Sequence, residues 1–312
     1  MLSRNHLMLR QPGLGREGGW TIIELMIVML IMLVVLAAVS QSFLTGLFSQ
    51  KLQAEQVRLQ ESSRFAFDLL SRSIRHAGYR NTYALLTGTS LPPGDFCNSS
   101  ALGSQFASVN DPASIDPTST TIAGSTVTIA NESDVVRVRF YGEDNGQGTA
   151  ADGSVIDCLG NSIRRGALVA ETLYVAADPS NHNEPALFCH STAVADNPVV
   201  VATGLPTNVA LSPNPAPLIP GVESLQLLFG EDTDGDGSIN RYVSPNNVSN
   251  PDNVVSVMVS MVVRTDNTVN KGLLDTPKHE FVQFGKTVTL PNDQRFRRLF
   301  TTTIAFRNFR QC

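Results

Sequence analysis

The feature that most constrains this chain is one long apolar segment near its N-terminus. Residues 25–39 are an unbroken apolar run, and Glu24 is the one charged residue in the sequence between positions 20 and 48. A helix needs about 20 mostly apolar residues to cross a bilayer, so this segment is long enough. Because the sequence has one such block, a protein with several membrane spans is excluded. Arginines at positions 4, 10 and 16 precede it, so we expect residues 1–19 in the cytoplasm and the rest exported.

The apolar pattern continues beyond the membrane-length block as an amphipathic helix. Its apolar positions recur at helical spacing: Leu52, Leu59, Phe67, Leu70 and Ile74. No proline occurs between residues 20 and 77, and Gly78 is suited to a C-cap. We therefore expect one helix over residues 20–77, with a transmembrane part at 20–48 and an amphipathic part at 49–78. A signal peptide cleaved near residues 37–40 is the alternative.

The remaining sequence predicts an exported, β-rich region. Charged residues make up 16% of the 312, well below the usual ~25%, and 42% are hydrophobic, which is enough for a core. Residues 79–133 are rich in Ser, Thr, Gly and Pro and predict a long loop with one short strand near 126–130, or in part a linker. Strand patterns then recur in a domain at 134–312, namely at 134–141, 171–176, 186–190, 199–202, 222–229, 254–264 and 298–306. The expected fold class is α+β, with a long N-terminal helix packed on a mostly antiparallel sheet.

The segment GWTIIELM, residues 19–26, resembles the prepilin signature of type IV pilins and pseudopilins. The resemblance implies that residues 1–19 are a leader, that prepilin peptidase cuts between Gly19 and Trp20, and that Trp20 is then N-methylated. Glu24 would neutralise the N-terminal amine of a neighbouring subunit during assembly. Such an ammonium and carboxylate attract each other strongly at low dielectric. The signature usually has Phe where this chain has Trp20; because Trp is also aromatic, we still expect processing. On physical grounds alone, Glu24 is equally an interfacial residue of a plain signal anchor.

Three further segments resemble the PilW family of minor pilins. They are SRFAFDLLSRSIRHAGYR at 63–80, LQLLFGEDTDGDGSINRYV at 225–243 and RRLFTTTIAFRN at 297–308. The resemblance implies a type IV pilin-like fold and a single-pass protein of the bacterial inner membrane with a periplasmic C-terminal domain. It also implies a role in priming pilus assembly with other minor pilins and the major pilin, with incorporation into surface pili. The alternatives are a type II secretion pseudopilin and a membrane-anchored adhesin that binds through residues 81–133.

An acidic segment at 232–240 is typical of the first half of an EF-hand-like calcium loop. Asp232, Asp234 and Asp236 alternate before Gly237, and Ser238 and Asn240 stand where such a loop supplies its seventh- and ninth-position oxygens. The twelfth position is Val243 instead of Glu, so an acid elsewhere, such as Asp252, would have to complete the set. We expect a weak Ca²⁺ site at these residues. The alternative is an acidic β-turn between two strands.

The four cysteines all follow the membrane-length segment, where an oxidising compartment favours disulfides. Four cysteines allow three pairings. We favour Cys158–Cys189, which joins neighbouring strand regions, and this leaves Cys97–Cys312 as the second pair. Zinc binding is the less favoured alternative, because the sequence has no C-x-x-C spacing.

The sequence gives no support for an enzyme or a nucleic-acid-binding protein. The five histidines are scattered, and no G-x-S-x-G, H-E-x-x-H or phosphate-loop motif occurs. The net charge of −5 argues against nucleic acid as a partner. The arginines at 295, 297 and 298 are expected on a solvent-exposed face where they pair with carboxylates.

Overall fold

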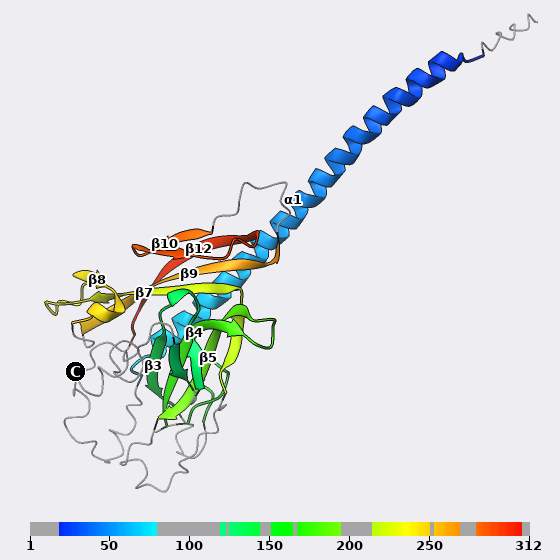
Figure 1. The fold of residues 1–312 in the computed structure, drawn as a ribbon. Helices are drawn as coiled ribbons and strands as arrows, with labels where there is room; N and C mark the ends of the chain where they lie inside the picture. Colours follow the sequence, from blue (N-terminus) through cyan, green and yellow to red (C-terminus); the bar gives the residue numbers. More distant parts are fainter. Residues whose placement is uncertain are drawn as a thin grey trace, which may run out of the picture. The chain divides into compact units, whose positions relative to one another are not determined.

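The structure is a computed structural model of the 312-residue chain. It describes residues 19–79, 119–122, 125–143, 151–164, 167–194, 214–249, 253–268 and 279–307. The chain divides into two compact units, Met1–Lys51 and Leu52–Cys312, and each is considered by itself below. Figure 1 labels the elements along the chain.

Helix α1 (Ile22–His76) agrees with the single helix expected over residues 20–77. Local sequence explains both ends. The Thr21 hydroxyl accepts a hydrogen bond from the Glu24 N–H at 3.3 Å, which makes Thr21 an N-terminal cap. Gly78 follows the helix with φ of 73°, a left-handed conformation that suits glycine and confirms its capping role.

The part of α1 in the second unit packs one face into the core. Leu59, Ala66, Leu70 and Ile74 are buried, and Phe67 packs against them. These residues recur at helical spacing, so the amphipathic pattern of the sequence is confirmed for this half. Phe65 lies on another face of the helix and remains 62% exposed.

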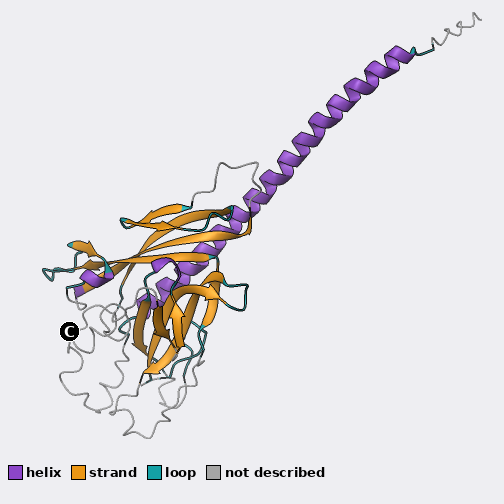
Figure 2. Cartoon of the chain, in the orientation of Figure 1, coloured by secondary structure: helices purple, strands orange, loops and turns teal. Residues whose placement is uncertain are grey.

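Two four-stranded antiparallel sheets form the body of the second unit (Figure 2). The first has the order β3-β4-β5-β6, with β3 (Val136–Tyr141), β4 (Leu168–Asp178), β5 (Glu184–Val194) and β6 (Ala216–Pro220). The second has the order β12-β9-β7-β8, with β7 (Val222–Glu231), β8 (Arg241–Val243), β9 (Val254–Thr268) and β12 (Arg295–Ala305). The α+β class is therefore confirmed, although the predicted single sheet is divided into two.

The core lies between the helix and the inner faces of both sheets. On β3, Val136, Val138 and Phe140 are buried, while Arg137 and Arg139 point to the other face, as the alternating sequence predicted. On β9, alternate residues from Val257 to Val263 join the same core cluster. Burial of these apolar faces, at roughly 25 cal/mol per Å², is the main force that holds the helix to the sheets.

The remaining strands form two hairpins, and the sequence predictions for them were incomplete. β1 (Ser119–Ile122) pairs with β2 (Ser125–Thr128) in the region expected to hold one short strand. β10 (Glu280–Gln283) pairs with β11 (Lys286–Thr289). These two strands, β6 and β8 were not predicted from the sequence. The strand expected at 199–202 lies outside the described residues. Two 3-10 turns, η2 (Ala130–Glu132) and η3 (Pro245–Asn247), complete the elements.

Hairpin β10–β11 covers the second face of the β7–β9 pair. The Gln283 amide accepts a hydrogen bond from Ser224 Oγ at 2.6 Å and donates one to Ser260 Oγ at 3.1 Å. Phe281 and Val288 pack against Val262 in a separate apolar cluster. This cover explains why β9 is buried on both faces although its serines alternate with apolar residues.

Candidate functional site

The first candidate site is the N-terminal segment that begins at Gly19. Gly19 and Trp20 precede α1, and Trp20 is 71% exposed. The residues of α1 that follow are exposed up to Leu47, although most are large and apolar. A window of this helix has a mean hydropathy of 3.1, so it is long and apolar enough to cross a membrane. The segment thus presents a continuous apolar surface that a lipid or another helix can cover.

Glu24 is placed in the first turn of this helix. Its backbone N–H is satisfied by Thr21, through the carbonyl at 3.1 Å and the hydroxyl at 3.3 Å. A carboxylate in the first turn interacts favourably with the helix dipole. Glu24 is therefore compatible with a helix start, and its charge lies four residues after Trp20 in an otherwise apolar segment.

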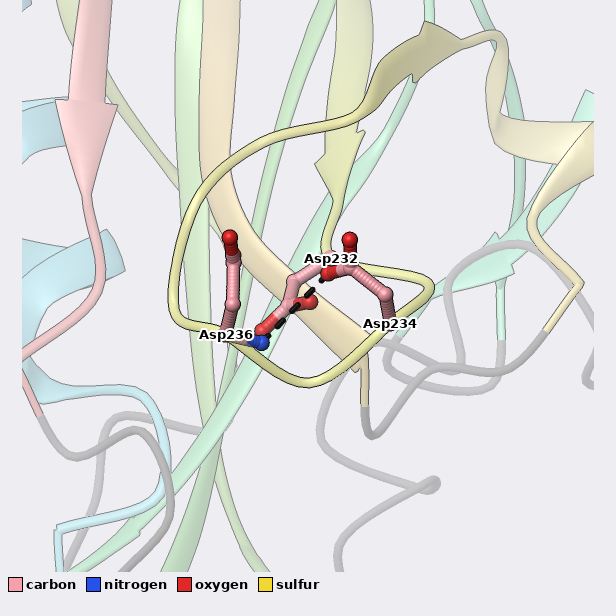
Figure 3. Close-up of side chains that lie close together, drawn as sticks. All are labelled: Asp232, Asp234 and Asp236. Atoms are coloured by element: carbon pink, nitrogen blue, oxygen red, sulfur yellow. Dashed lines mark hydrogen bonds between the residues drawn. The ribbon is translucent and has the colours of Figure 1, made fainter.

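The second candidate site is the acidic loop between β7 and β8. The structure brings Asp232, Asp234 and Asp236 together, with one carboxylate oxygen of each within 4.8 Å of the others (Figure 3). This is the one group of three such ligand residues among the described ranges. Asp234 and Asp236 are exposed, whereas Asp232 is fully buried at the base of the loop.

Hydrogen bonds from backbone N–H groups of the loop to the Asp232 carboxylate fix the shape of the loop. The Asp232 carboxylate accepts the N–H of Gly235 at 2.6 Å and that of Gly237 at 2.9 Å. Both glycines have φ above 80°, so the tight turn depends on them. The conformation of the loop therefore depends on the Asp232 carboxylate.

The other predicted ligands are only partly arranged for a cation. The Asn240 side chain accepts the Thr233 N–H at 2.6 Å and donates to Asp234 at 3.2 Å, and the Ser238 N–H donates to Asp236 at 2.7 Å. Val243 lies in β8 and offers no carboxylate, and Asp252 lies outside the described residues. The arrangement fits the acidic turn as well as a cation loop.

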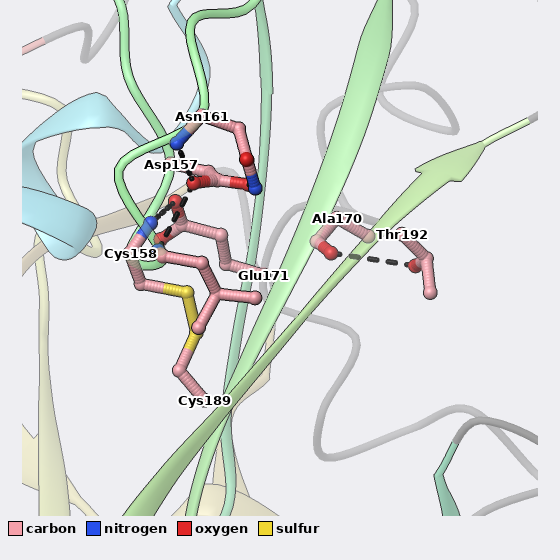
Figure 4. Close-up of a disulfide and its surroundings, with 8 residues drawn as sticks. Asp157, Cys158, Asn161, Ala170, Glu171, Cys189 and Thr192 are labelled. Atoms are coloured by element: carbon pink, nitrogen blue, oxygen red, sulfur yellow. Dashed lines mark hydrogen bonds between the residues drawn. A yellow bond between two sulfur atoms is a disulfide. The ribbon is translucent and has the colours of Figure 1, made fainter. Parts of the chain in front are cut away.

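A disulfide joins Cys158 to Cys189 on β5, with their Cα atoms 6.4 Å apart, which is the pairing favoured from the sequence (Figure 4). Cys97 and Cys312 lie outside the described residues. Asp157 shapes the turn around Cys158, because its carboxylate accepts the N–H groups of Leu159 at 3.0 Å and Asn161 at 2.7 Å. The disulfide therefore ties a surface turn to a strand of the first sheet.

Glu171 is a buried carboxyl group next to this disulfide, which was not predicted from the sequence. Its Oε1 accepts the Cys158 N–H at 2.7 Å. Burial raises the pKa of Glu171 to about 7, against the opposing effect of hydrogen bonds from Ser73 and Cys158. The available signal was a single glutamate inside the apolar run LVAETLYVAA.

Arg295 and Arg297 pair with carboxylates, as expected, and Arg298 is exposed, as expected. The expectation of a solvent-exposed face was wrong for Arg297. Its side chain is fully buried, and its Nε lies 2.6 Å from Glu223 while its Nη2 lies 2.8 Å from Asp293. Arg264 also contacts Glu223, at 3.2 Å. β7, β9 and β12 lie side by side, so their charged residues meet inside the unit, where a sequence pattern alone placed them on the surface.

Two further residues extend this buried ionic cluster to the first sheet. Arg295 binds Glu184 through two hydrogen bonds, at 2.9 and 2.7 Å, and Arg264 also pairs with Glu184. Burial lowers the pKa of Arg264 to about 10, and the neighbouring Arg295 adds to this shift. Burial likewise raises the pKa of Glu223, although Arg297 acts against it. The cluster therefore links the two sheets.

Comparison with protein families finds one similarity, in the C-terminal half of the chain. The family model described as Type IV Pilus-assembly protein W matches residues 172–308. The match covers less than half of the chain, in the region after the long helix. The similarity is to PilW proteins, which confirms the resemblance inferred from the sequence over the matched region.

The chain was also compared with solved structures and with curated proteins. Among solved structures, a type IV-like pilin from Thermus thermophilus matches with a TM-score of 0.35 and 14% identity, covering 81% of this chain and 97% of that chain. Comparison with curated proteins gives no significant match.

Proposed function

We propose that this chain is a minor pilin that acts in the assembly and priming of type IV pili. The observation that carries the proposal is the pairing of two features in one chain. A membrane-length N-terminal helix has Glu24 as its one charged residue before position 48, and residues 172–308 match a pilus-assembly family. On this proposal the protein has a mechanical role in assembly and no enzymatic one.

The proposed mechanism begins with processing in the inner membrane. Prepilin peptidase removes residues 1–19, Trp20 is methylated, and the domain after the helix lies in the periplasm. Glu24 then pairs with the N-terminal amine of a neighbouring pilin, while the domain contacts other minor pilins and the major pilin. A charge pair in lipid is favourable because each charge alone would be costly there.

Replacing Glu24 tests the proposed mechanism. Glu24→Ala should leave the protein in the membrane but reduce its amount in sheared pili at least about tenfold. Glu61→Ala is the matched control, because Glu61 is an exposed glutamate of the same helix in the second unit. The proposal is contradicted if Glu24→Ala and Glu61→Ala enter pili equally well.

We further propose that the loop of Asp232, Asp234 and Asp236 binds Ca²⁺ weakly, with Ser238 and Asn240 as additional ligands. The support is the convergence of three carboxylates within 4.8 Å. Without a glutamate at the twelfth position, a dissociation constant of about 10⁻⁴–10⁻³ M is expected. Titration calorimetry on the detergent-solubilised chain should show Ca²⁺ binding, and Asp234→Ala should abolish it. Asp266→Ala, which changes an exposed residue of β9, is the control and should preserve binding. The absence of heat at millimolar Ca²⁺ would reject the site.

A further inference from the structure

Three of the four edge strands of the two main sheets are protected against pairing with another chain. β8 is only three residues long, and β6 contains Pro217 and Pro220. The outer edge of β3 is bonded to the residues that follow α1, because the Gly78 N–H donates to the Arg139 carbonyl and the Tyr141 N–H donates to the Tyr79 carbonyl, both at 2.9 Å. Short length, proline and cover are common ways to block an edge.

β12 is the fourth edge, and it has none of these protections within the part of the chain that the structure describes. It is 11 residues long and pairs with β9 in an unbroken register from Arg298 to Ala305. Residues 299–305, LFTTTIA, include no charge, proline or glycine and are rich in β-branched side chains. A long, regular and uncharged edge of this kind is a template for another strand.

The hydrogen-bonding pattern identifies which backbone groups of β12 are available to another strand. The Phe306 N–H donates to the Val255 carbonyl at 3.0 Å, and bonded residues alternate along an antiparallel strand. The odd-numbered residues 299–305 therefore direct their N–H and C=O groups away from β9. The described residues supply no hydrogen-bond partner for these groups.

We propose that the free edge of β12 binds an extended strand of a partner protein subunit, which becomes a fifth strand of the sheet. An antiparallel arrangement is favoured because it is the more stable one per residue. This inference rests on the sheet and goes beyond the proposed pilus role, which is tested separately.

The side chains of β12 specify the chemistry of the partner strand. Phe300 and Ile304 lie on the core side and favour apolar neighbours, whereas Thr301 and Thr303 are exposed on the other face and favour hydroxyl or other small polar neighbours. Arg298 is exposed at the start of this stretch and favours a carboxylate. The partner strand therefore alternates apolar and polar residues and ends with an acidic one.

A second copy of this chain matches these requirements less well. If two β12 strands paired antiparallel about Thr302, Arg298 would face Phe306 of the other copy, next to its Arg307. That arrangement supplies no carboxylate to Arg298 and brings two arginines close together.

A synthetic strand tests the proposal directly. The probe is a fluorescent, acetylated peptide amide with the sequence Val-Thr-Val-Thr-Val-Thr-Glu. In the antiparallel arrangement its glutamate would face Arg298, and its valines would lie on the same face of the sheet as Phe300. Its binding to the detergent-solubilised full chain is measured by fluorescence anisotropy. We expect saturable binding that is lost when the threonine amides of the peptide are N-methylated, because those N–H groups would bond to β12.

Substitutions at position 303 separate edge pairing from other contacts. Thr303→Pro removes an outward N–H that β9 does not use and should weaken binding at least about tenfold, or about 1.4 kcal/mol. Thr303→Val keeps the N–H and should bind like the unchanged chain. Thermal unfolding checks that both variants remain folded.

Charge reversal tests the orientation of the partner strand. Arg298→Glu should weaken the glutamate peptide about threefold and favour a peptide that ends in lysine. The proposal is overturned if the N-methylated peptide binds equally well, if Thr303→Pro has no effect, or if no peptide binds. It is also overturned if the full chain dimerises through β12 and Thr303→Pro makes it monomeric, because the edge would then belong to a second copy.

Discussion

Glu171 links the protonation of one residue to the stability of the folded unit. It is 1% exposed, and burial raises its pKa from 4.5 to about 7. Between these two values the folded chain holds a proton on Glu171 that the unfolded chain releases. Stability from this residue therefore falls as pH rises through the folded-state pKa. Asp134 acts in the same direction at lower pH, since burial raises its pKa to about 6.

Glu171→Gln should remove most of this pH dependence. The amide keeps an acceptor for the Cys158 N–H but carries no charge. We expect the unchanged chain to lose on the order of 2–3 kcal/mol of stability between about pH 5 and 8. The variant should lose much less, and Glu280→Gln, on the exposed start of β10, should behave like the unchanged chain. Equal pH slopes for Glu171→Gln and the unchanged chain in denaturant titrations would contradict this role.

Two adjacent arginines allow a matched test of the buried ionic cluster. Arg297→Met leaves Glu223 buried without its closest partner, and a loss of about 3 kcal/mol is expected. Arg298→Met changes the next residue, which is exposed and lies 5.6 Å from the ring of Phe300, and should change stability by less than about 1 kcal/mol. Thermal unfolding followed by near-ultraviolet circular dichroism compares the two. Similar losses for both would show that burial of Arg297 is not important.

At the residue scale, the sequence predicted features whose cause is local. The alternation of Asp232, Asp234 and Asp236 directly implied that they lie together. The burial of Glu171 and Arg297 could not be predicted, because it depends on which strands become neighbours. Glu223 and Arg297 are far apart in the sequence and meet only through the order of strands in the second sheet.

At the scale of elements, the disulfide should stabilise the segment 151–164 on the first sheet. Cys158 and Cys189 are separated by 31 positions, and closing a loop of that size is expected to contribute about 3–4 kcal/mol. Replacing both cysteines by alanine should lower the free energy of unfolding by that amount and make the segment more sensitive to proteases. Ser154→Ala, within the same segment but exposed, is the control. An unchanged unfolding midpoint in the double variant would contradict this role.

The elements that the sequence predicted best have strong local signals. α1 has a helical apolar pattern, a cap at Thr21 and a glycine at its end, and β9 has a long run of β-branched residues. β6 contains two prolines and β8 has three residues, so neither has a strand pattern of its own. The division into two sheets also depends on tertiary pairing, which local patterns do not specify.

At the scale of the whole molecule, two separate parts of the chain support the proposed role in pilus assembly. The N-terminal segment has the length and hydropathy of a membrane span and a signature that resembles prepilins. Residues 172–308 match a pilus-assembly family independently of that segment. The sequence alone suggested both parts because each carries its own motif, whereas the buried ionic cluster and the free edge of β12 required the structure.

The most direct test of the central claim is mass spectrometry of the N-terminal peptide, recovered from membranes and from sheared pili. The proposed role predicts a mature chain that begins at Trp20, with a methylated amine, in both fractions. A chain that retains Met1 in cells with an active prepilin peptidase, and that is absent from pili, would contradict the claim and leave a plain membrane-anchored protein.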